Sequence, residues 1–167
     1  FILDTLSGIY GVTKPQLDFN NPFELLIATI LSAQCTDRRV NIVTKELFAK
    51  YKTPQDYIDA DISDLEKMIF STGFYRNKAK NIKNCCSVLL EKYKGTVPAD
   101  VDKIAGLPGA GRKTASVVAG NAFNIPAIAV DTHVIRITNL LGLVNSKNPE
   151  IIERELKLIF PEKYWVQ

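Results

Sequence analysis

The stretch that decides the fold is LPGAGRKTASVVAGNAFNIPAIAVDTH, which runs from Leu107 to His133. It opens with a glycine-punctuated turn, and a helix that carries Lys113 near its first turn is expected to follow directly. The partial positive charge of a helix N-terminus disfavours an ammonium, so we expect Lys113 to lose its proton more readily than a solvated lysine and to serve as a nucleophilic amine. Asp131 precedes the next apolar-periodic run, where a carboxylate can cap a helix or take part in chemistry.

The turn before this helix holds Gly109 and Gly111, and the apolar spacing of the residues up to Leu107 predicts a short helix in front of it. Glycine at these positions lets the backbone turn sharply and approach a phosphate with no side chain in the way. The successive amides of residues 109–113 would then bind an anion without reading base sequence. A plain joint between two helices shows the same glycines, so the turn alone leaves both interpretations open.

Three motifs together carry a family resemblance. LPGAGRKTA followed by AVDTH resembles the helix-hairpin-helix, Gly-Pro-Asp motif of the endonuclease III family of DNA base-excision repair enzymes. LSAQCTD at 31–37 and TGFYRNKAKNI at 72–82 also resemble that family, in the same order and at the same spacing. The resemblance therefore covers nearly the whole chain.

The residue pattern predicts an all-α fold, because almost every segment reads as helix and no stretch shows sustained alternation with period two. The resemblance implies two helical lobes. The first would be a six-helix barrel over residues 15–125, with the helix-hairpin-helix at about 100–123. The second would be formed by both chain ends, residues 1–14 and 126–167.

Several helix starts carry capping signals. The first ten residues look like the tail of a helix, whereas residues 23–34 are apolar nearly all round and predict a helix in the middle of the domain. Further helices are expected at about 38–51 and 77–93, each with one apolar stripe. The expected capping residues are Asn21 before Pro22, Asp37, Thr53, Ser63 with Glu66, Asp131, and Asn148 before Pro149. The apolar face of the last helix is expected to hold Ile152, Leu156 and Ile159.

Composition is that of an ordinary globular protein: of 167 residues, 46% are hydrophobic and 23% are charged. The net charge of +3 gives only a modest indication of a polyanionic partner. The local distribution of charge is more informative, since the run RNKAKNIK at 76–83 is rich in basic side chains and contains no acid.

Cysteine usage indicates a reducing compartment. Cys35, Cys85 and Cys86 are odd in number, and the adjacent pair cannot form an ordinary disulfide, so buried or half-buried thiols are expected. No signal-peptide pattern opens the chain, and no apolar run is long enough to span a bilayer. We therefore expect a monomeric, intracellular protein of the cytoplasm or nucleoid with no membrane partner.

Two positions outside the hairpin have alternative interpretations. Ser32 and Gln34 stand where apolar packing would be expected, which on residue pattern alone favours a C-terminal helix turn. The resemblance implies instead that Gln34 enters the space left by an extruded base, where a carboxamide offers a donor and an acceptor to the orphaned partner. Phe74, at the tip of a turn, would either staple neighbouring helices together or, as the resemblance implies, act as a wedge between bases.

Basic residues follow this turn. Arg76, Lys78 and Lys80 would each either hold a phosphate or lie on a solvated helix face. The only histidine, His133, would either make a local hydrogen bond in the first turn of its helix or contact DNA. The full set expected to contact DNA is Gln34, Phe74, Arg76, Lys78, Gly109, Gly111, Arg112, Thr114 and His133.

The resemblance implies a bifunctional DNA glycosylase and AP lyase that acts on oxidised pyrimidines or abasic sites in double-stranded DNA. Lys113 would attack C1′ of the deoxyribose, and Asp131 would stabilise the developing positive charge and help to deprotonate the amine. The adenine-removing branch of the superfamily uses the aspartate without the lysine, so the pair favours the bifunctional class. The alternatives are a monofunctional adenine glycosylase relative, a non-catalytic helix-hairpin-helix DNA-binding module and a helical interaction scaffold.

No catalytic metal is expected within this chain, because one histidine cannot make a metal site and no carboxylate pair suited to magnesium is evident. The resemblance implies that the hairpin carbonyls of Leu107 and Gly109 can bind a monovalent cation. Many members of the family also carry a four-cysteine 4Fe-4S cluster. The sequence contains no such cysteine set, so we expect a cluster only if the native chain continues past Gln167, the alternative being a branch without it.

Overall fold

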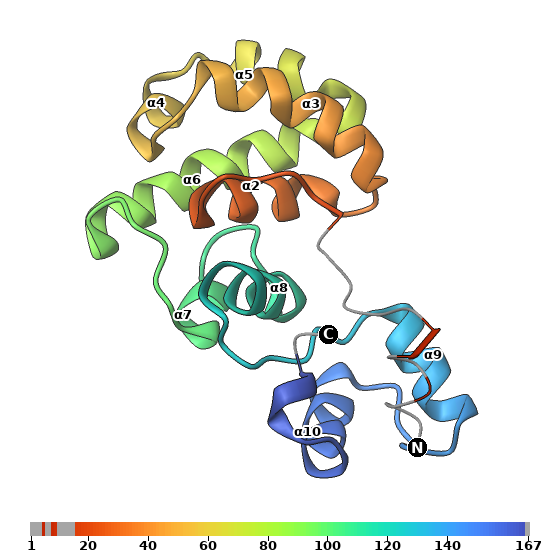
Figure 1. Ribbon diagram of the computed structural model, residues 1–167. Coiled ribbons are helices and arrows are strands. Elements are labelled where there is room, and N and C mark those ends of the chain that lie inside the picture. The colour runs from red at the N-terminus through yellow and green to blue at the C-terminus, as the bar shows by residue number, and fades with distance from the viewer. Residues whose placement is uncertain (1–4, 6–7, 10–15, 166–167) are drawn as a thin grey trace.

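The computed structural model describes residues 5, 8–9 and 16–165 of the chain, and every regular element in this part is a helix. The all-α prediction is therefore confirmed (Figure 1). Of the helix expected within the first ten residues, only Thr5, Gly8 and Ile9 are described, and they are helical; the rest lies outside the described residues. The elements are α2 (Pro22–Ser32), α3 (Asp37–Lys50), α4 (Pro54–Asp59), α5 (Ile62–Ile69), the 3-10 helix η1 (Phe70–Thr72), α6 (Tyr75–Tyr93), α7 (Val101–Ala105), α8 (Arg112–Phe123), α9 (Thr132–Leu140), α10 (Pro149–Ile159) and the 3-10 helix η2 (Glu162–Tyr164).

The larger hydrophobic core is built around α2. This helix is buried from Phe23 to Leu31 apart from Glu24, because its sequence is apolar on nearly every side, and it packs against α3, α6 and α8. Helices α3, α4 and α5 form the upper part of the view in Figure 1, α2 and α6 the middle, and α7 and α8 the lower edge of this part. The prediction of a central helix is confirmed, although the helix ends at Ser32, two residues before the predicted end at 34.

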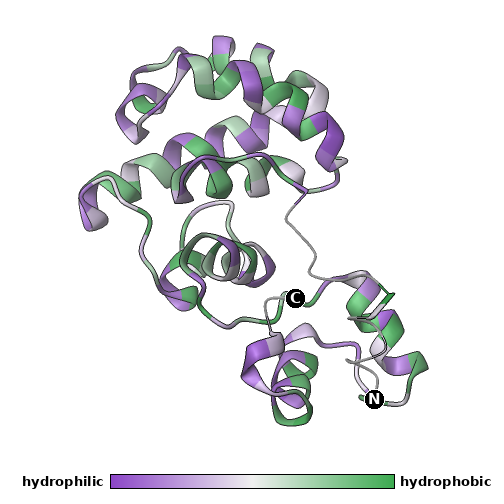
Figure 2. Cartoon of the chain, in the orientation of Figure 1, coloured by the Kyte–Doolittle hydropathy of each residue, from purple (hydrophilic) through white to green (hydrophobic). Residues whose placement is uncertain are grey.

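A second, smaller core lies at the other end of the molecule, around α9 and α10 (Figure 1). Both helices mix hydrophobic and hydrophilic residues (Figure 2), and their apolar sides meet the segments that flank them. The boundaries of two lobes, 15–125 against the two chain ends, stay a prediction. The fully or nearly buried apolar residues of this core are Val130, Val144, Ile152 and Leu156.

Most of the expected helix starts are confirmed. The side chains of Asn21, Thr53, Asp131 and Asn148 each accept hydrogen bonds from amides of the first turn that follows, and these bonds satisfy donors that a helix start leaves unpaired. The buried stripe of α3 is also as expected, and α6 begins two residues before its predicted start at 77.

Three local predictions are wrong. Thr36, rather than Asp37, caps α3, and Asp61 caps α5 two residues before the expected Ser63. In each case the residue with extended backbone stands one position before the helix, and its side chain reaches the first-turn amides; the predicted cap is already helical. Ile159 is 45% exposed, because α10 ends there and the apolar face closes at Leu156.

Among the described residues, no helix is both long enough and apolar enough to cross a bilayer.

Candidate active site

The hairpin turn places the start of α8. Gly109 has a φ of +80°, which strains other residues, and an added Cβ would lie 2.9 Å from Cβ of Asn81 on α6. Glycine is therefore required there by conformation and by close packing. Gly111 differs from the expectation: its φ of −91° suits any residue, and an added Cβ would meet nothing within 4 Å. The fold does not demand glycine at position 111, and the space before it is open.

Two of the described α-helices begin without a side-chain cap, α8 at Gly111 and α6 at Phe74. The first amides of an uncapped helix remain free to bind another acceptor, and the helix dipole adds partial positive charge beside them. The other α-helices from α2 to α10 each have a side-chain cap. The uncapped starts coincide with the hairpin and the Phe74 turn, the two places where a DNA contact is expected.

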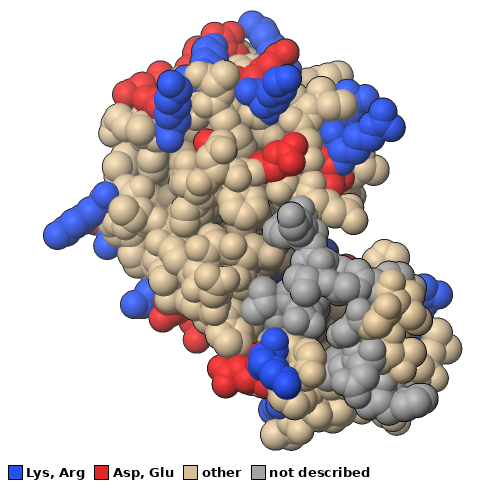
Figure 3. All heavy atoms as spheres, in the orientation of Figure 1, with Lys and Arg blue, Asp and Glu red and all other residues tan. Residues whose placement is uncertain are grey.

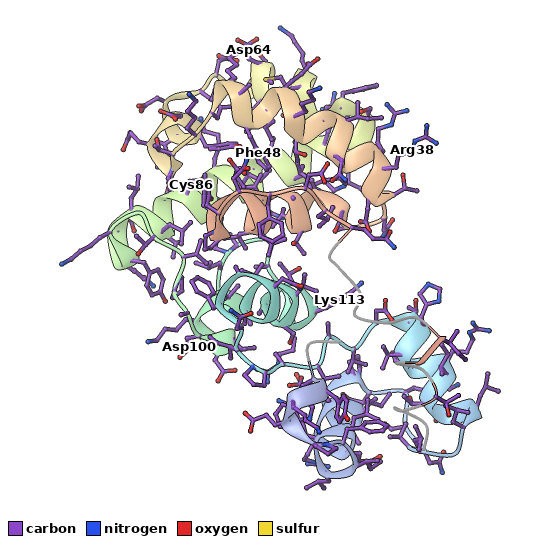
Figure 4. The ribbon with its side chains drawn as sticks, in the orientation of Figure 1. Arg38, Phe48, Asp64, Cys86, Asp100 and Lys113 are labelled. Atoms are coloured by element: carbon purple, nitrogen blue, oxygen red, sulfur yellow. The ribbon has the colours of Figure 1, made fainter. Side chains whose placement is uncertain are left out.

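Lys113 and Asp131 meet. The Nζ atom of Lys113 on α8 lies 3.5 Å from Oδ2 of Asp131 at the start of α9, although eighteen residues separate them in the chain. The lysine side chain is 58% exposed and the aspartate 29% exposed, so both can be reached from solvent. Lys113 lies in the first turn of α8, and its side chain points toward the part of the chain that forms the smaller core (Figure 4).

The two oxygens of the Asp131 carboxylate have different partners: one caps α9 and the other faces the Lys113 amine. Its Oδ1 accepts the amides of His133 and Val134, both at 2.9 Å, which leaves Oδ2 directed to Lys113. Partial burial alone would raise the pKa of Asp131, but the Val134 amide, the Lys113 charge and the His133 amide together hold it below its usual range. Asp131 is therefore a carboxylate at neutral pH.

This pair lines a hollow of about 580 Å³ between the two cores. Of the other residues expected to contact DNA, Gln34 and His133 also line it. Ser32, which the sequence marked as polar where apolar packing was expected, and Cys35, which no sequence signal placed there, belong to the same wall. The lining residues are Ser32, Gln34, Cys35, Lys113, Val130, Asp131, Thr132, His133, Ile135 and Pro149.

Arg112 is not placed as expected for a residue that holds DNA. Its guanidinium forms a bidentate pair with Glu153 of α10, at 3.1 Å for each bond, and also bonds Asp102 of α7. Hydrogen bonds to these two carboxylates raise the pKa of Arg112. Arg112 thus ties α8 to α7 and α10. Glu153, whose side chain is only 7% exposed, was missed because its neighbours Ile152 and Leu156 gave no sign of a buried partner.

The predicted placement of Lys78 is also wrong. The prediction placed its ammonium on a phosphate or in solvent, but the residue is 5% exposed. Its Nζ donates to the carbonyl oxygens of Leu31 and Thr72, each at 2.8 Å. The ends of α2 and η1 leave carbonyls without helical partners, and a buried ammonium satisfies them.

The turns at Gln34 and Phe74 both project outward. Each residue has a positive φ, 54° and 47°, which is uncommon for residues other than glycine. The Phe74 side chain is 64% exposed, so it does not staple helices together. Arg76 is exposed beside it, with its guanidinium over the ring of Tyr75. Thr114, in the first turn of α8, is half-buried.

The cysteines of the described chain do not suit a four-cysteine cluster. Cys85 and Cys86 are buried in the larger core, where burial raises the pKa of the Cys85 thiol to about 12, and Cys35 lies apart at the hollow. No three His, Cys, Asp or Glu side chains gather as a metal site within the described residues. A cluster carried by residues past Gln167 stays a prediction. At the hairpin, the Leu107 carbonyl accepts the Ala110 amide, and a monovalent cation on the Leu107 and Gly109 carbonyls stays a prediction.

The fold and the hairpin site define a class, that of helical DNA repair proteins, and comparison with known proteins agrees. Residues 27–162 match the HhH-GPD superfamily base excision DNA repair proteins. The chain is 47% identical over 166 residues to endonuclease III of Bacillus subtilis (strain 168), covering 99% of this chain and 76% of that protein. It is 42% identical over 151 residues to endonuclease III of Escherichia coli (strain K12), covering 90% and 72%.

Solved structures give the same result. A trapped endonuclease III–DNA covalent intermediate superposes with a TM-score of 0.95 at 50% identity, covering 98% of this chain and 78% of that one. A non-covalent endonuclease III–DNA complex also superposes with a TM-score of 0.95, at 49% identity, covering 99% and 78%. This chain belongs to the endonuclease III family. The predicted class, a bifunctional base-excision DNA glycosylase and AP lyase, is confirmed.

Proposed function

We propose that this enzyme removes oxidised pyrimidines from double-stranded DNA and then cuts the strand at the resulting abasic site, with Lys113 as the nucleophile. The observation that carries the proposal is the meeting of Lys113 and Asp131, 3.5 Å apart, at the wall of an open hollow of about 580 Å³. A hollow of this size accommodates a nucleotide extruded from the duplex. Because both residues belong to one chain, we propose that a monomer suffices.

The first chemical step is displacement of the base. Neutral Lys113 attacks C1′ of the deoxyribose, the C1′–N bond breaks, and the base leaves with the electron pair and takes up a proton. Asp131 stabilises the positive charge that develops on the sugar and accepts a proton from the attacking nitrogen. Its low pKa suits the first task, because the carboxylate is charged before the reaction begins.

The second step follows from the first. Opening of the sugar ring gives an iminium between Lys113 and C1′, which acidifies the C2′ hydrogens. Loss of a C2′ proton then expels the 3′ phosphate by β-elimination, and water releases Lys113 from the product. One amine therefore serves both base removal and strand cleavage. A relative 50% identical to this chain has been trapped as a covalent intermediate with DNA, which supports the covalent route.

The remaining residues would hold the duplex. The uncapped amides at the start of α8, with open space before Gly111, suit a phosphate, and a monovalent cation on the Leu107 and Gly109 carbonyls would add positive charge beside it. Thr114 and Arg76 would add polar contacts to the backbone. On the face shown in Figure 3, basic and acidic side chains are interspersed, so the described part of this face carries no broad basic patch.

Gln34, Phe74 and His133 would act at the lesion. Gln34 would fill the space left by the extruded base, and Phe74 would slide between neighbouring bases and support the kink. Both side chains are exposed on outward turns, and Gln34 shares the hollow with the catalytic pair. His133, on the wall beside Asp131, would contact the extruded nucleotide.

The proposal is tested by trapping the iminium. Wild-type enzyme incubated with a thymine-glycol duplex and borohydride is expected to form a covalent protein–DNA adduct, and Lys113→Gln is expected to form none. Lys92→Gln, which removes an exposed lysine at the far end of α6, is the matched control and should form adduct as the wild type does. An adduct that persists in folded Lys113→Gln would mean that another amine reacts.

A further inference from the structure

Lys78 connects two separate turns through one buried ammonium. Its Nζ donates to the carbonyl of Leu31, in the last turn of α2, and to the carbonyl of Thr72, at the end of η1, at 2.8 Å in both cases. Forty-seven and six residues separate Lys78 from these partners, so α6 carries the ammonium between two elements distant in the chain. Thr72, like Lys78 itself, is almost completely buried.

The two carbonyls belong to residues that come just before the two outward turns in the chain. Leu31 precedes Gln34 by three residues, and Thr72 precedes Phe74 by two. Gln34 and Phe74 both have left-handed backbone, a conformation that persists in non-glycine residues only where the surroundings hold it. The ammonium of Lys78 therefore lies where it can fix the positions of the Gln34 and Phe74 side chains relative to each other.

We propose that Lys78 is a positioning residue that holds the Gln34 turn and the Phe74 turn at a fixed separation, so that both side chains enter the duplex together when the damaged nucleotide is extruded. This inference rests on the proposed function, because it assigns a task to the base-extrusion step. Lys78 does not touch DNA; it acts through the backbone of the two turns.

The surroundings of the ammonium support this role. No carboxylate in the described part of the chain forms an ion pair with Lys78, so its charge is stabilised by the two carbonyl dipoles. Burial lowers the pKa of Lys78, while nearby Cys35 opposes this effect. An ammonium that depends on two carbonyls also constrains them, since either bond is lost if its turn moves outward. Replacing the ammonium by an apolar group would remove the donor that Lys78 supplies to each oxygen.

The test compares two DNA substrates on the same protein. Borohydride trapping is measured on an abasic site in duplex DNA, which requires insertion of the two turns, and on an abasic site in single-stranded DNA, which does not. For Lys78→Met, the ratio of the duplex rate to the single-strand rate is expected to fall about tenfold. A displacement of a positioned group by about 1 Å can lower a rate by as much as about 10²-fold, and we expect the two turns to move by less than this. Lys78→Gln, which retains one amide donor group, is expected to recover part of the ratio.

Lys83→Met is the matched control. Lys83 lies on the same helix, and its Nζ also donates to two carbonyls, those of Ile58 and Ala60, but at the end of α4, away from both turns. It should lose comparable thermal stability and keep the wild-type substrate ratio. All rates are taken well below each variant's unfolding temperature.

Three results overturn the inference: an unchanged substrate ratio in Lys78→Met, an equal change in Lys83→Met, or failure of both Lys78 variants to fold, which would assign the ammonium to the whole fold. Failure of the proposed function is seen separately, as absence of adduct from the wild-type enzyme on both substrates or its persistence in Lys113→Gln. Adduct chemistry that is intact on single-stranded DNA with a reduced duplex rate supports both.

Discussion

The two hydrophobic cores differ in how they are closed. The larger core surrounds α2, an α-helix apolar on nearly all sides, and most of its contacts are apolar, with the buried ammonium of Lys78 at one end. The smaller core around α10 has few fully buried apolar residues, and beside them lies the nearly buried Glu153, paired with Arg112 and Lys157. The two reacting groups stand on opposite sides of this division. An ion pair between α8 and α10 therefore supports a catalytic geometry that packing on the smaller side leaves less constrained.

The largest expected effect comes from changing the carboxylate on the smaller side. Asp131→Asn should lower the single-turnover rate of base removal by about 10²- to 10⁴-fold, because the amide cannot take a proton or balance the sugar's positive charge. Asparagine caps helices as well as aspartate does, so α9 should keep its start. The rate is measured on a thymine-glycol duplex under enzyme excess.

DNA affinity and thermal stability serve as controls for this variant. Both should change little, since the hydrogen bonds from the His133 and Val134 amides remain possible with an amide oxygen. Turnover equal to that of the wild type would reduce Asp131 to a helix cap and would remove the carboxylate from the mechanism.

The next largest effect compares the cores directly. Leu26→Ala in the larger core is expected to lower the free energy of unfolding by about 4 kcal/mol, because a completely buried leucine leaves a cavity that rigid neighbours cannot fill. Leu156→Ala in the smaller core is expected to cost about 2 kcal/mol, because its partly buried neighbours can move into the space. Denaturant unfolding of the two variants gives both values. Equal losses would show that the cores are equally well packed and would break the comparison.

The sequence predicts features that depend on neighbouring residues better than contacts between residues far apart in the chain. The central helix, its cap at Asn21 and the cap at Asp131 follow from local rules, since each depends on residues within a few positions. The resemblance added the pairing of Lys113 with Asp131, a contact between residues eighteen positions apart that no local rule supplies.

The errors at Lys78 and Arg112 have a physical reason. An isolated lysine or arginine on a helix reads as a solvated or phosphate-binding cation, because cations are rarely buried without partners. The partners of Lys78 are backbone carbonyls, which every residue has, so no residue type announces them. The partners of Arg112 are Asp102 on α7 and Glu153, which is forty-one residues away on α10. Contacts of this kind become visible only when the helices are packed.

Another variant weakens the ion pair between α8 and α10. Glu153→Gln should lower stability by about 1–2 kcal/mol, less than removal of a fully buried partner costs, because Arg112 is partly exposed and keeps Asp102. It should also slow base removal by several-fold, as α8 and α10 become less firmly joined beside Lys113. Glu150→Gln, at an exposed position of the same helix, is the matched control. A stability loss with no change in rate would show that the pair supports the fold and not the reaction.

The smallest effect concerns pH. Burial would raise the pKa of Glu153, but hydrogen bonds from Arg112 and Lys157 and their charges hold it below its usual range. A carboxyl with a folded pKa below its unfolded one binds fewer protons when folded, so its stabilisation is complete above the unfolded pKa of about 4.3 and is lost as pH falls through the folded pKa. The difference in unfolding temperature between wild type and Glu153→Gln should therefore be constant from pH 7 to about pH 5 and shrink below pH 4. Other acidic groups titrate in the same range, but they are common to both proteins and cancel in the difference. A gap that stays constant down to pH 3 would mean that Glu153 stabilises the smaller core by packing rather than by charge.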